Sequence, residues 1–263
     1  MKDLEQKGRY RAVWARSETE RRAAFRLRHR CFIEAAGLDP RPGHEDRDAF
    51  DGAFEHLIVQ PVTGDTPVAC CRVGLFDATT VAKSSYSAAV YDLSPFSVRQ
   101  GRMAEIGRFC IAPEALFDPD ILRVAWGALT TYVDRHDVQL LFGCSSFVGT
   151  TPADHDAGFR LLGARHVAPP TLAPSVNATE IVPLPTDAPL DLAMARLGLS
   201  QLPPLLRTYI RMGGWVSDHA VIDRELNTMH VLTGLEVHAV PAGRARILRR
   251  MARTGIEPQG TSG

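Results

Sequence analysis

The chain has 263 residues, of which 45% are hydrophobic and 23% charged, and its 30 Lys and Arg balance 30 Asp and Glu. This composition is ordinary for a globular protein with a substantial core, and no run approaches the ~18 consecutive apolar residues that a membrane span needs. The polar, basic start of the chain lacks the apolar stretch of a secretory signal. Five cysteines without a metal-binding spacing predict free thiols in a reducing compartment. We therefore expect a cytoplasmic protein.

The first third of the chain has the pattern of a strand, a helix, a loop and two further strands. Residues 10–15 have a strand pattern, and Ser17 with Glu20 has the spacing of a capping box, so a helix should run from there to about Phe32. Residues 37–52, rich in Gly, Pro and Asp, predict a loop. The next two strands are predicted over residues 56–62 and 67–76, with a turn at residues 63–65.

Strands and helices alternate in the rest of the chain. Apolar residues at helical spacing make residues 120–136 the clearest helix, and a continuous apolar run predicts a buried strand over residues 138–144. The proline-rich residues 168–189 predict a surface loop. The remaining predicted elements are a strand over 103–112, helices over 154–162 and 204–212, and strands near 220–222 and 231–237.

This order of elements predicts an α/β protein with one mixed central sheet flanked by helices. We expect residues 1–243 to form a single domain, with a C-terminal extension from about residue 168. Residues 244–253 contain five arginines and no acidic residue. We expect residues 244–263 to be a basic, flexible tail, and contact of its arginines with an anionic membrane is the alternative.

The N-terminal segment is also basic, because residues 1–32 carry ten Lys or Arg against four acidic residues. One interpretation is a solvated face. The other is an electrostatic landing surface for an acidic protein or an anionic membrane. Nucleic acid is a weaker candidate, because aromatic side chains are not interleaved with these charges.

Charged residues recur beside the apolar elements. They are Arg28 and Arg30 near the end of the first helix, Asp46, Asp48 and Asp51 in the loop, Arg72 in the third strand, and Glu105 with Arg108 in the fourth strand. Each charge taken singly would be a surface ion pair. Because buried charges need partners, the set on consecutive core elements predicts a shared cleft that could bind a zwitterion.

Glu105 and Arg108 are three residues apart, so they would point to opposite faces of a regular strand. A bulge between them, which we expect at Gly107, would bring both side chains to one side. Other candidate nucleophiles and bases are weaker. His56 fits a structural strand histidine, Cys144 ends a buried strand where thiols are usually inert, and Ser145 lacks the flanking glycines of a nucleophile elbow.

The segments Leu27–Phe32, Asp48–Asp51, Arg72 and Glu105–Phe109 resemble the signature of the acyl-homoserine lactone synthases, which have the GNAT fold. Further segments are similar to motifs of a sister family, the bacterial ornithine N-acyltransferases that make lyso-ornithine lipid. These are His56–Val59, Tyr86–Ser87, Tyr91–Leu93, Gly143–Phe147, Leu202–Leu206 and Gly214–Val216. The resemblance covers roughly residues 25–237.

The resemblance implies an enzyme that transfers a 3-hydroxyacyl group to the α-amine of ornithine, the first step of ornithine lipid biosynthesis. It implies that Glu105 is the general base, acting directly or through a water, and that Arg108 helps to orient the reacting groups. The substrate-binding residues that it implies are Arg28, Asp48, Asp51, His56, Arg72, Phe109, Cys144, Ser145 and Ser146.

The turn over residues 112–119 bears on the acyl donor. It lacks the glycines that expose backbone N–H groups to a pyrophosphate in acetyl-CoA enzymes. We therefore expect no separate cofactor and a donor whose acyl group is carried on the 4'-phosphopantetheine of acyl carrier protein. The product would be an amphiphile, so peripheral contact with the inner face of the cytoplasmic membrane is also expected.

Three rivals are left open by the sequence. One is an acyl-homoserine lactone synthase, which is disfavoured because Leu38 stands where that family usually has Trp. The second is an N-acyltransferase for another amino acid such as glutamine, glycine or lysine. The third is a non-catalytic acyl-carrier or lipid-binding module, against which the presence of Glu105 beside the arginines argues.

Overall fold

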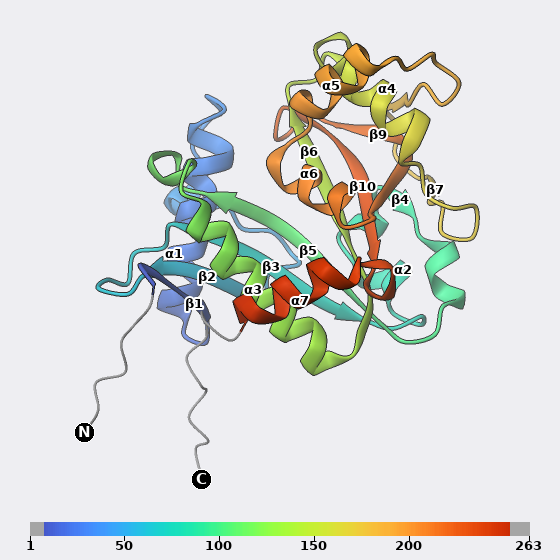
Figure 1. Cartoon of the computed structure of the whole chain (residues 1–263). Coiled ribbons are helices and arrows are strands. Elements are labelled where there is room, and N and C mark those ends of the chain that lie inside the picture. The colour runs from blue at the N-terminus through green and yellow to red at the C-terminus, as the bar shows by residue number, and fades with distance from the viewer. Residues whose placement is uncertain (1–7, 253–263) are drawn as a thin grey trace. The chain divides into compact units, whose positions relative to one another are not determined.

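The computed structural model describes residues 8–252, and its contacts divide the chain into two compact units (Figure 1). Unit 1 contains the described parts of Met1–Val73, Arg108–His136 and Ala242–Gly263, and unit 2 contains Gly74–Gly107 and Asp137–Pro241.

The strands of unit 1 are β1 (Tyr10–Trp14), β2 (Glu55–Pro61), most of β3 (Ala69–Phe76) and the end of β5 (Arg102–Ile111). They follow the order β1-β2-β3-β5, and β2 is antiparallel to both β1 and β3. In this register His56 lies opposite Arg72, which places two of the predicted site residues side by side on neighbouring strands.

Helix α1 (Glu18–His29) begins at the predicted capping box. The Ser17 hydroxyl accepts a hydrogen bond from the Glu20 backbone N–H at 3.2 Å, and the Glu20 carboxylate accepts one from the Ser17 N–H at 2.8 Å. The predicted helix to Phe32 is only partly α-helical, because Arg30–Glu34 forms a wider π-helical turn. Such turns are frequent at functional sites.

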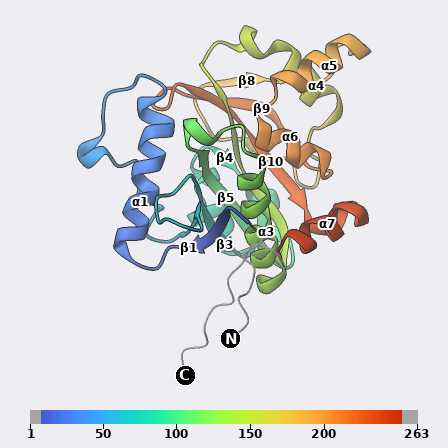
Figure 2. The ribbon, with the colours of Figure 1, turned by 60° about the vertical axis from the view of Figure 1, so that its left-hand side comes forward.

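Two further helices belong to unit 1 and lie side by side in both views, α3 (Pro119–His136) and α7 (Ala242–Ala252) (Figures 1 and 2). Gly127 permits the close approach, since a Cβ there would lie 3.0 Å from the Met251 carbonyl oxygen. We expected a flexible tail from residue 244, but residues 244–252 are helical. The rest of that segment lies outside the described residues.

Unit 2 contains the start of β5, then β6 (Val138–Val148), β10 (Thr228–Glu236), β9 (Trp215–Asp223) and β8 (Ile181–Pro183), in that order across the sheet. Strands β5 and β6 are parallel, and the other pairs are antiparallel. The pairs of β5 with β6 run from Arg102–Val138 to Glu105–Phe142 and end there. Both strands continue past this point, β5 to Ile111 and β6 to Val148.

The remaining elements of unit 2 are α2 (Val81–Ser84), β4 (Tyr91–Asp92), α4 (Asp156–Arg165), β7 (Ser175–Val176), α5 (Leu192–Gln201) and α6 (Pro204–Arg211). Strands β4 and β7 form a separate pair. Helix α5, which we did not predict, is capped by the Asp191 carboxylate on the Met194 N–H at 2.7 Å. It lies against α4 (Figure 2), where Gly198 allows close contact with the Ala157 carbonyl.

The described helices are too short or too polar to cross a lipid bilayer.

Candidate active site

A cluster of arginines and aspartates forms inside unit 1. Arg28, at the end of α1, donates from Nε to Asp46 Oδ2 at 2.8 Å and from Nη1 to Asp51 Oδ1 at 2.7 Å. Arg28 and Asp46 are both almost completely buried. Since a lone buried charge is costly, these two residues require each other.

Three more arginines complete this Arg–Asp cluster. Arg72 Nη1 donates to Asp48 at 2.5 Å and to Asp51 at 2.9 Å. Arg108 contacts Asp46 at 3.2 Å and Asp48 at 3.3 Å, and Arg41 contacts Asp46 at 2.6 Å. The cluster thus joins four arginines to three aspartates. Its more accessible members are Asp48, Arg41 and Arg108, with 21%, 20% and 12% of their side chains exposed.

Two aspartates of the cluster, Asp46 and Asp51, are held in their ionised form. Burial opposes ionisation of Asp51, but hydrogen bonding and charge attraction from Arg28 outweigh it and lower the pKa to about 2. Burial also opposes ionisation of Asp46, and the charges of Arg108 and Arg28 lower its pKa nevertheless. Each carboxylate therefore remains a hydrogen-bond acceptor at neutral pH.

The backbone of β5 bends at Arg108, which has a φ of 51°. This left-handed conformation is uncommon for a residue with a side chain. We expected a bulge at Gly107, and the irregular residue is Arg108 itself, one position later. The bend breaks the strict alternation of side chains that a flat strand would impose between positions 105 and 108.

Glu105 lies in unit 2 and is 1% exposed. Its carboxylate accepts hydrogen bonds from the Tyr86 N–H at 2.8 Å, the Ser87 N–H at 2.7 Å and the Ser87 hydroxyl at 2.5 Å. Donors of this kind stabilise the ionised carboxylate and fix its orientation. Glu105 is therefore a buried, preorganised acceptor.

The Ser87 hydroxyl also contacts the Cys144 thiol on β6 at 3.5 Å. Cys144 and Ser146 alternate with buried Ser145 along this strand. Ser145 instead accepts a hydrogen bond from the Thr233 hydroxyl at 2.9 Å, and Ser146 is exposed. Of these three predicted residues, Cys144 is the one joined to Glu105 through Ser87.

Comparison with known proteins now decides the family. An acetyltransferase (GNAT) domain matches residues 27–118. The L-ornithine N(alpha)-acyltransferase of Rhodobacter capsulatus is 33% identical over 240 residues, covering 88% of this chain and 91% of that protein. The enzyme of the same name from Brucella abortus is 29% identical, covering 86% and 84%, and that from Rhizobium meliloti is 29% identical, covering 85% and 78%.

The chain belongs to the L-ornithine N(alpha)-acyltransferase family. The protein is therefore an N-acyltransferase, and the predicted family, the GNAT fold class and the enzyme class are confirmed. The matched GNAT segment of this family member runs from Leu27 to Asp118, so it contains the whole Arg–Asp cluster and Glu105.

Several predicted site residues of this acyltransferase meet in the Arg–Asp cluster, namely Arg28, Asp48, Asp51, Arg72 and Arg108. Arg30 does not join them, because its guanidinium pairs with Glu114 at 2.9 Å. Arg41 was missed, and a single arginine in a polar loop gives no signal in one sequence. The sequence singled out Ser87 only as part of a segment that resembles the family. Its contacts with Glu105 and Cys144 were not predicted.

Two predicted binding residues of this family member pack inside unit 1. His56 is 2% exposed, its Nε2 contacts the Asp51 carbonyl oxygen at 3.0 Å, and burial lowers its pKa. Its ring packs edge-on against Phe25. Phe109 is half-buried and packs with Val59 and Ala125. For both residues the contacts support the packing of unit 1, and their substrate-binding roles stay predictions.

His29, Glu34 and His44 gather possible metal-ligand atoms within 4.8 Å of one another. The Arg41 backbone N–H donates to His29 Nε2 at 3.1 Å, which places the ring proton on Nδ1, 3.0 Å from the Glu34 carboxylate. A metal on Nδ1 would need the opposite tautomer, with Nε2–H facing the Arg41 N–H. The arrangement therefore fits a hydrogen-bonded histidine better than a metal ligand.

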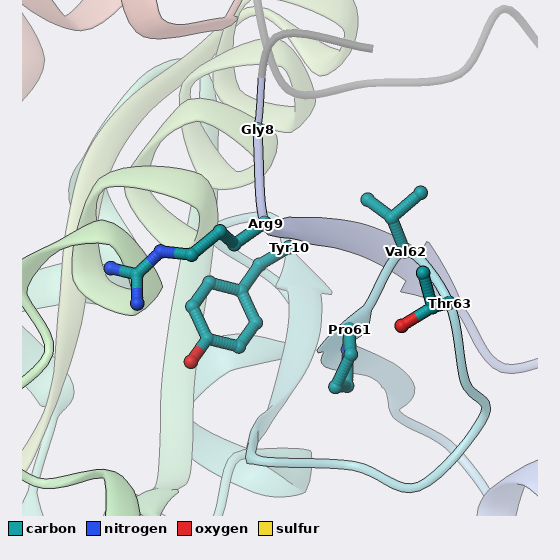
Figure 3. Close-up of a pocket in the computed structure, with 6 residues that line it drawn as sticks. All are labelled: Gly8, Arg9, Tyr10, Pro61, Val62 and Thr63. Atoms are coloured by element: carbon teal, nitrogen blue, oxygen red, sulfur yellow. The ribbon is translucent and has the colours of Figure 1, made fainter.

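A surface pocket of about 400 Å³ lies where β1 starts and β2 ends. It is lined by Gly8, Arg9, Tyr10, Pro61, Val62 and Thr63 (Figure 3). Arg9 and the Tyr10 hydroxyl are held by Asp118, at 2.9 Å each. The polar groups of this pocket thus serve the junction of β1 with the start of α3, and none belongs to the Arg–Asp cluster.

Proposed function

We propose that the protein transfers a 3-hydroxyacyl group from acyl carrier protein to the α-amine of L-ornithine, which gives lyso-ornithine lipid. The observation that carries the acceptor is the 33% identity over 240 residues to a protein named for that reaction.

Glu105 is the proposed general base. An ammonium group must lose a proton before it can attack a thioester, and a fixed, ionised carboxylate can accept that proton directly or through a water. The hydrogen bonds from the Tyr86 N–H, the Ser87 N–H and the Ser87 hydroxyl orient this carboxylate before the substrate arrives. Backbone N–H groups beyond the last β5–β6 pair would stabilise the tetrahedral oxyanion, and the thiolate then leaves.

The Arg–Asp cluster is the proposed site for the charged groups of the amino acid. The cluster contains four guanidinium groups, and such groups bind carboxylates in a planar, bidentate manner. Arg41 and Arg108 are accessible enough to do so. Asp48, with 21% of its side chain exposed, is the acid best placed to receive the ornithine side-chain amine.

The start of α3 supports a carrier-bound donor over coenzyme A. Asp118 occupies this end of the helix, where its Oδ1 accepts from the Asp120 N–H at 3.1 Å, and Glu114 lies exposed in the same turn. A helix N-terminus is a favourable phosphate site only when its N–H groups are open. The Asp118 side chain already occupies the Asp120 N–H, which leaves this end of the helix less open to a pyrophosphate.

The same turn presents an apolar surface. Phe117 is 98% exposed and Leu116 is 56% exposed, and an exposed aromatic residue is a common anchor of protein interfaces. The basic segment before it contributes less than its charge predicts, because Arg22 and Arg26 both approach Glu45, at 2.7 and 3.7 Å. We propose that carrier protein docking depends more on Phe117 than on these arginines.

The test of the acceptor and the donor is a direct assay. The protein is incubated with 3-hydroxyacyl carrier protein and, in separate reactions, ornithine, glutamine, lysine, glycine and S-adenosylmethionine, and products are identified by mass spectrometry. We expect an Nα-acylornithine as the dominant product. Dominant acylation of another amine, or equal rates with acyl-CoA, would overturn the corresponding part of the proposal.

Peripheral contact with an anionic membrane is proposed for α7. Arg244, Arg246 and Ile247 are all exposed on this helix, the last at 54%, and exposed arginines with an exposed apolar residue are typical of an interfacial helix. Arg244→Glu with Arg246→Glu should reduce flotation with phosphatidylglycerol vesicles, whereas the control pair Arg196→Glu with Arg224→Glu, in unit 2, should not. Equal flotation of both variants would contradict this contact.

A further inference from the structure

Three of the five cysteines lie together in unit 1, on three different elements. Cys31 is in the π-helical turn after α1, Cys70 is on β3 and Cys110 is on β5. The sulfurs of Cys70 and Cys110 are 3.6 Å apart. Cys31 packs against the buried cluster that contains Cys70 and Cys110, and its thiol donates to the carbonyl oxygen of Ile111, the residue after Cys110, at 3.4 Å. Acyl transfer has no use for these thiols.

Exposure distinguishes the three members of this thiol cluster. Cys70 and Cys110 are only 3% and 6% exposed, whereas Cys31 is half-buried. A small oxidant can therefore reach Cys31 first. An accessible thiol beside a second, resolving thiol is the arrangement found in redox-sensitive cysteines.

The pKa values of Cys31 and Cys110 also favour Cys31 as the more reactive thiol. The neighbouring Cys110 thiol lowers the pKa of Cys31, and the charge of Arg30 adds to this against the opposing effect of burial. The same contact with Cys31, the contact with Cys70 and burial raise the pKa of Cys110 well above its usual range. Cys31 is thus the member with the greater thiolate character, and the thiolate is the form that reacts.

We propose that Cys31 is a peroxide-reactive thiol and that Cys110 resolves its oxidised form to a disulfide. The Cys31 thiolate attacks one oxygen of hydrogen peroxide, so that an S–O bond forms, the O–O bond breaks and hydroxide leaves. The Cys110 thiol then gives its proton to the departing oxygen and attacks the Cys31 sulfur. The S–S bond forms, the S–O bond breaks, and two thiols and one peroxide have become one disulfide and two waters.

The position of this pair connects it with the Arg–Asp cluster. Cys31 follows Arg28 by three residues and Cys110 follows Arg108 by two, and both arginines donate to Asp46, at 2.8 and 3.2 Å. A disulfide requires the two sulfurs to be about 2 Å apart, closer than a thiol–thiol contact. The two elements that carry these arginines must adjust when it forms, so oxidation should lower acyl transfer until a reductant is added.

The experiment uses the full chain, treated with hydrogen peroxide, alkylated to block remaining thiols and mapped by mass spectrometry without reduction. We expect a linked peptide pair joining Cys31 to Cys110, reversed by dithiothreitol. Cys71→Ser is the matched control, since Cys71 is 2% exposed and burial raises its pKa well above the usual range. This variant should form the same link at the same peroxide concentration.

Two further variants keep the proposal testable if the link is slow. In Cys110→Ser, the oxidised Cys31 has no resolving thiol and should be trapped by dimedone as a sulfenic acid adduct. In Cys31→Ser, peroxide should leave Cys110 unmodified. Dimedone labelling of Cys71 in preference to Cys31, or a Cys70–Cys110 link with free Cys31, would overturn the assignment. These readouts do not depend on which amine the enzyme acylates.

Discussion

The Arg–Asp cluster of unit 1 and Glu105 of unit 2 hold their charges in different ways. In the cluster, charged side chains neutralise one another, so the loss of one member strands buried partners. Glu105 accepts hydrogen bonds from two backbone N–H groups and the Ser87 hydroxyl, and these donors remain when its side chain changes. The contrast suggests that changes in the cluster act chiefly on folding stability, and changes around Glu105 chiefly on rate.

Arg28→Ala should give the largest effect on stability. It removes the buried guanidinium that pairs with both Asp46 and Asp51, and breaking a buried pair in this way costs about 3–5 kcal/mol. Urea unfolding followed by circular dichroism measures this. The control is Arg28→Lys, which keeps a positive charge beside Asp46 and Asp51 and should cost less. A loss below ~1 kcal/mol for Arg28→Ala would contradict the buried-pair interpretation.

Lowering the pH should weaken the cluster through Asp51. Its folded pKa is about 2, below the ordinary value of 3.8. The contribution of this carboxylate is therefore fully present above pH 3.8 and is lost as the pH falls toward 2, at about 2 kcal/mol in all. Unfolding free energies of wild type and Asp51→Asn between pH 6 and pH 2.5 should converge as the pH falls. Parallel curves would show that Asp51 titrates normally.

Ser87→Ala should reduce the rate with little change in stability. It removes the hydroxyl donor to Glu105 but leaves the Ser87 backbone N–H in place. A charge-assisted hydrogen bond of this kind corresponds to about a 10-fold loss in kcat. The acidic limb of the pH–rate profile should also move to higher pH, because the ionised carboxylate has lost a donor. Ser87→Thr, which keeps the hydroxyl, should restore most of the rate.

Arg30→Ala should give the smallest effect. Its partner is Glu114, and 42% and 61% of the two side chains are exposed, so the pair contributes less than ~1 kcal/mol. Because Arg30 and Arg28 are two residues apart in the chain, the two substitutions compare an exposed with a buried ion pair directly. Equal losses of unfolding free energy in Arg30→Ala and Arg28→Ala would contradict the difference between the exposed and the buried pair.

Local rules predicted the elements that depend on neighbours in the chain. The Ser17–Glu20 capping box and the apolar spacing of α3 gave the right helices, because both signals lie within a few residues. Helix α5 was missed, since its buried contact with α4 uses a glycine, Gly198, instead of an apolar stripe. Apolar periodicity cannot show a helix of this kind.

Long-range contacts set the limits of the site prediction. Arg28, Asp51, Arg72 and Arg108 were grouped correctly, because charges repeated beside core elements must find one another. Arg30 lies outside the cluster because the π-helical turn directs it toward Glu114. Arg41 joins the cluster because the loop that carries it passes beside Asp46. The left-handed conformation of Arg108 has no signal in composition either.

The central claim is that Glu105 accepts the proton of the attacking amine. The most direct test is the single-turnover rate of acyl transfer from 3-hydroxyacyl carrier protein to ornithine, compared between wild type and Glu105→Gln. We predict a loss of about 100-fold or more, with carrier protein binding unchanged and the variant folded by circular dichroism. A near wild-type rate in Glu105→Gln would contradict the account.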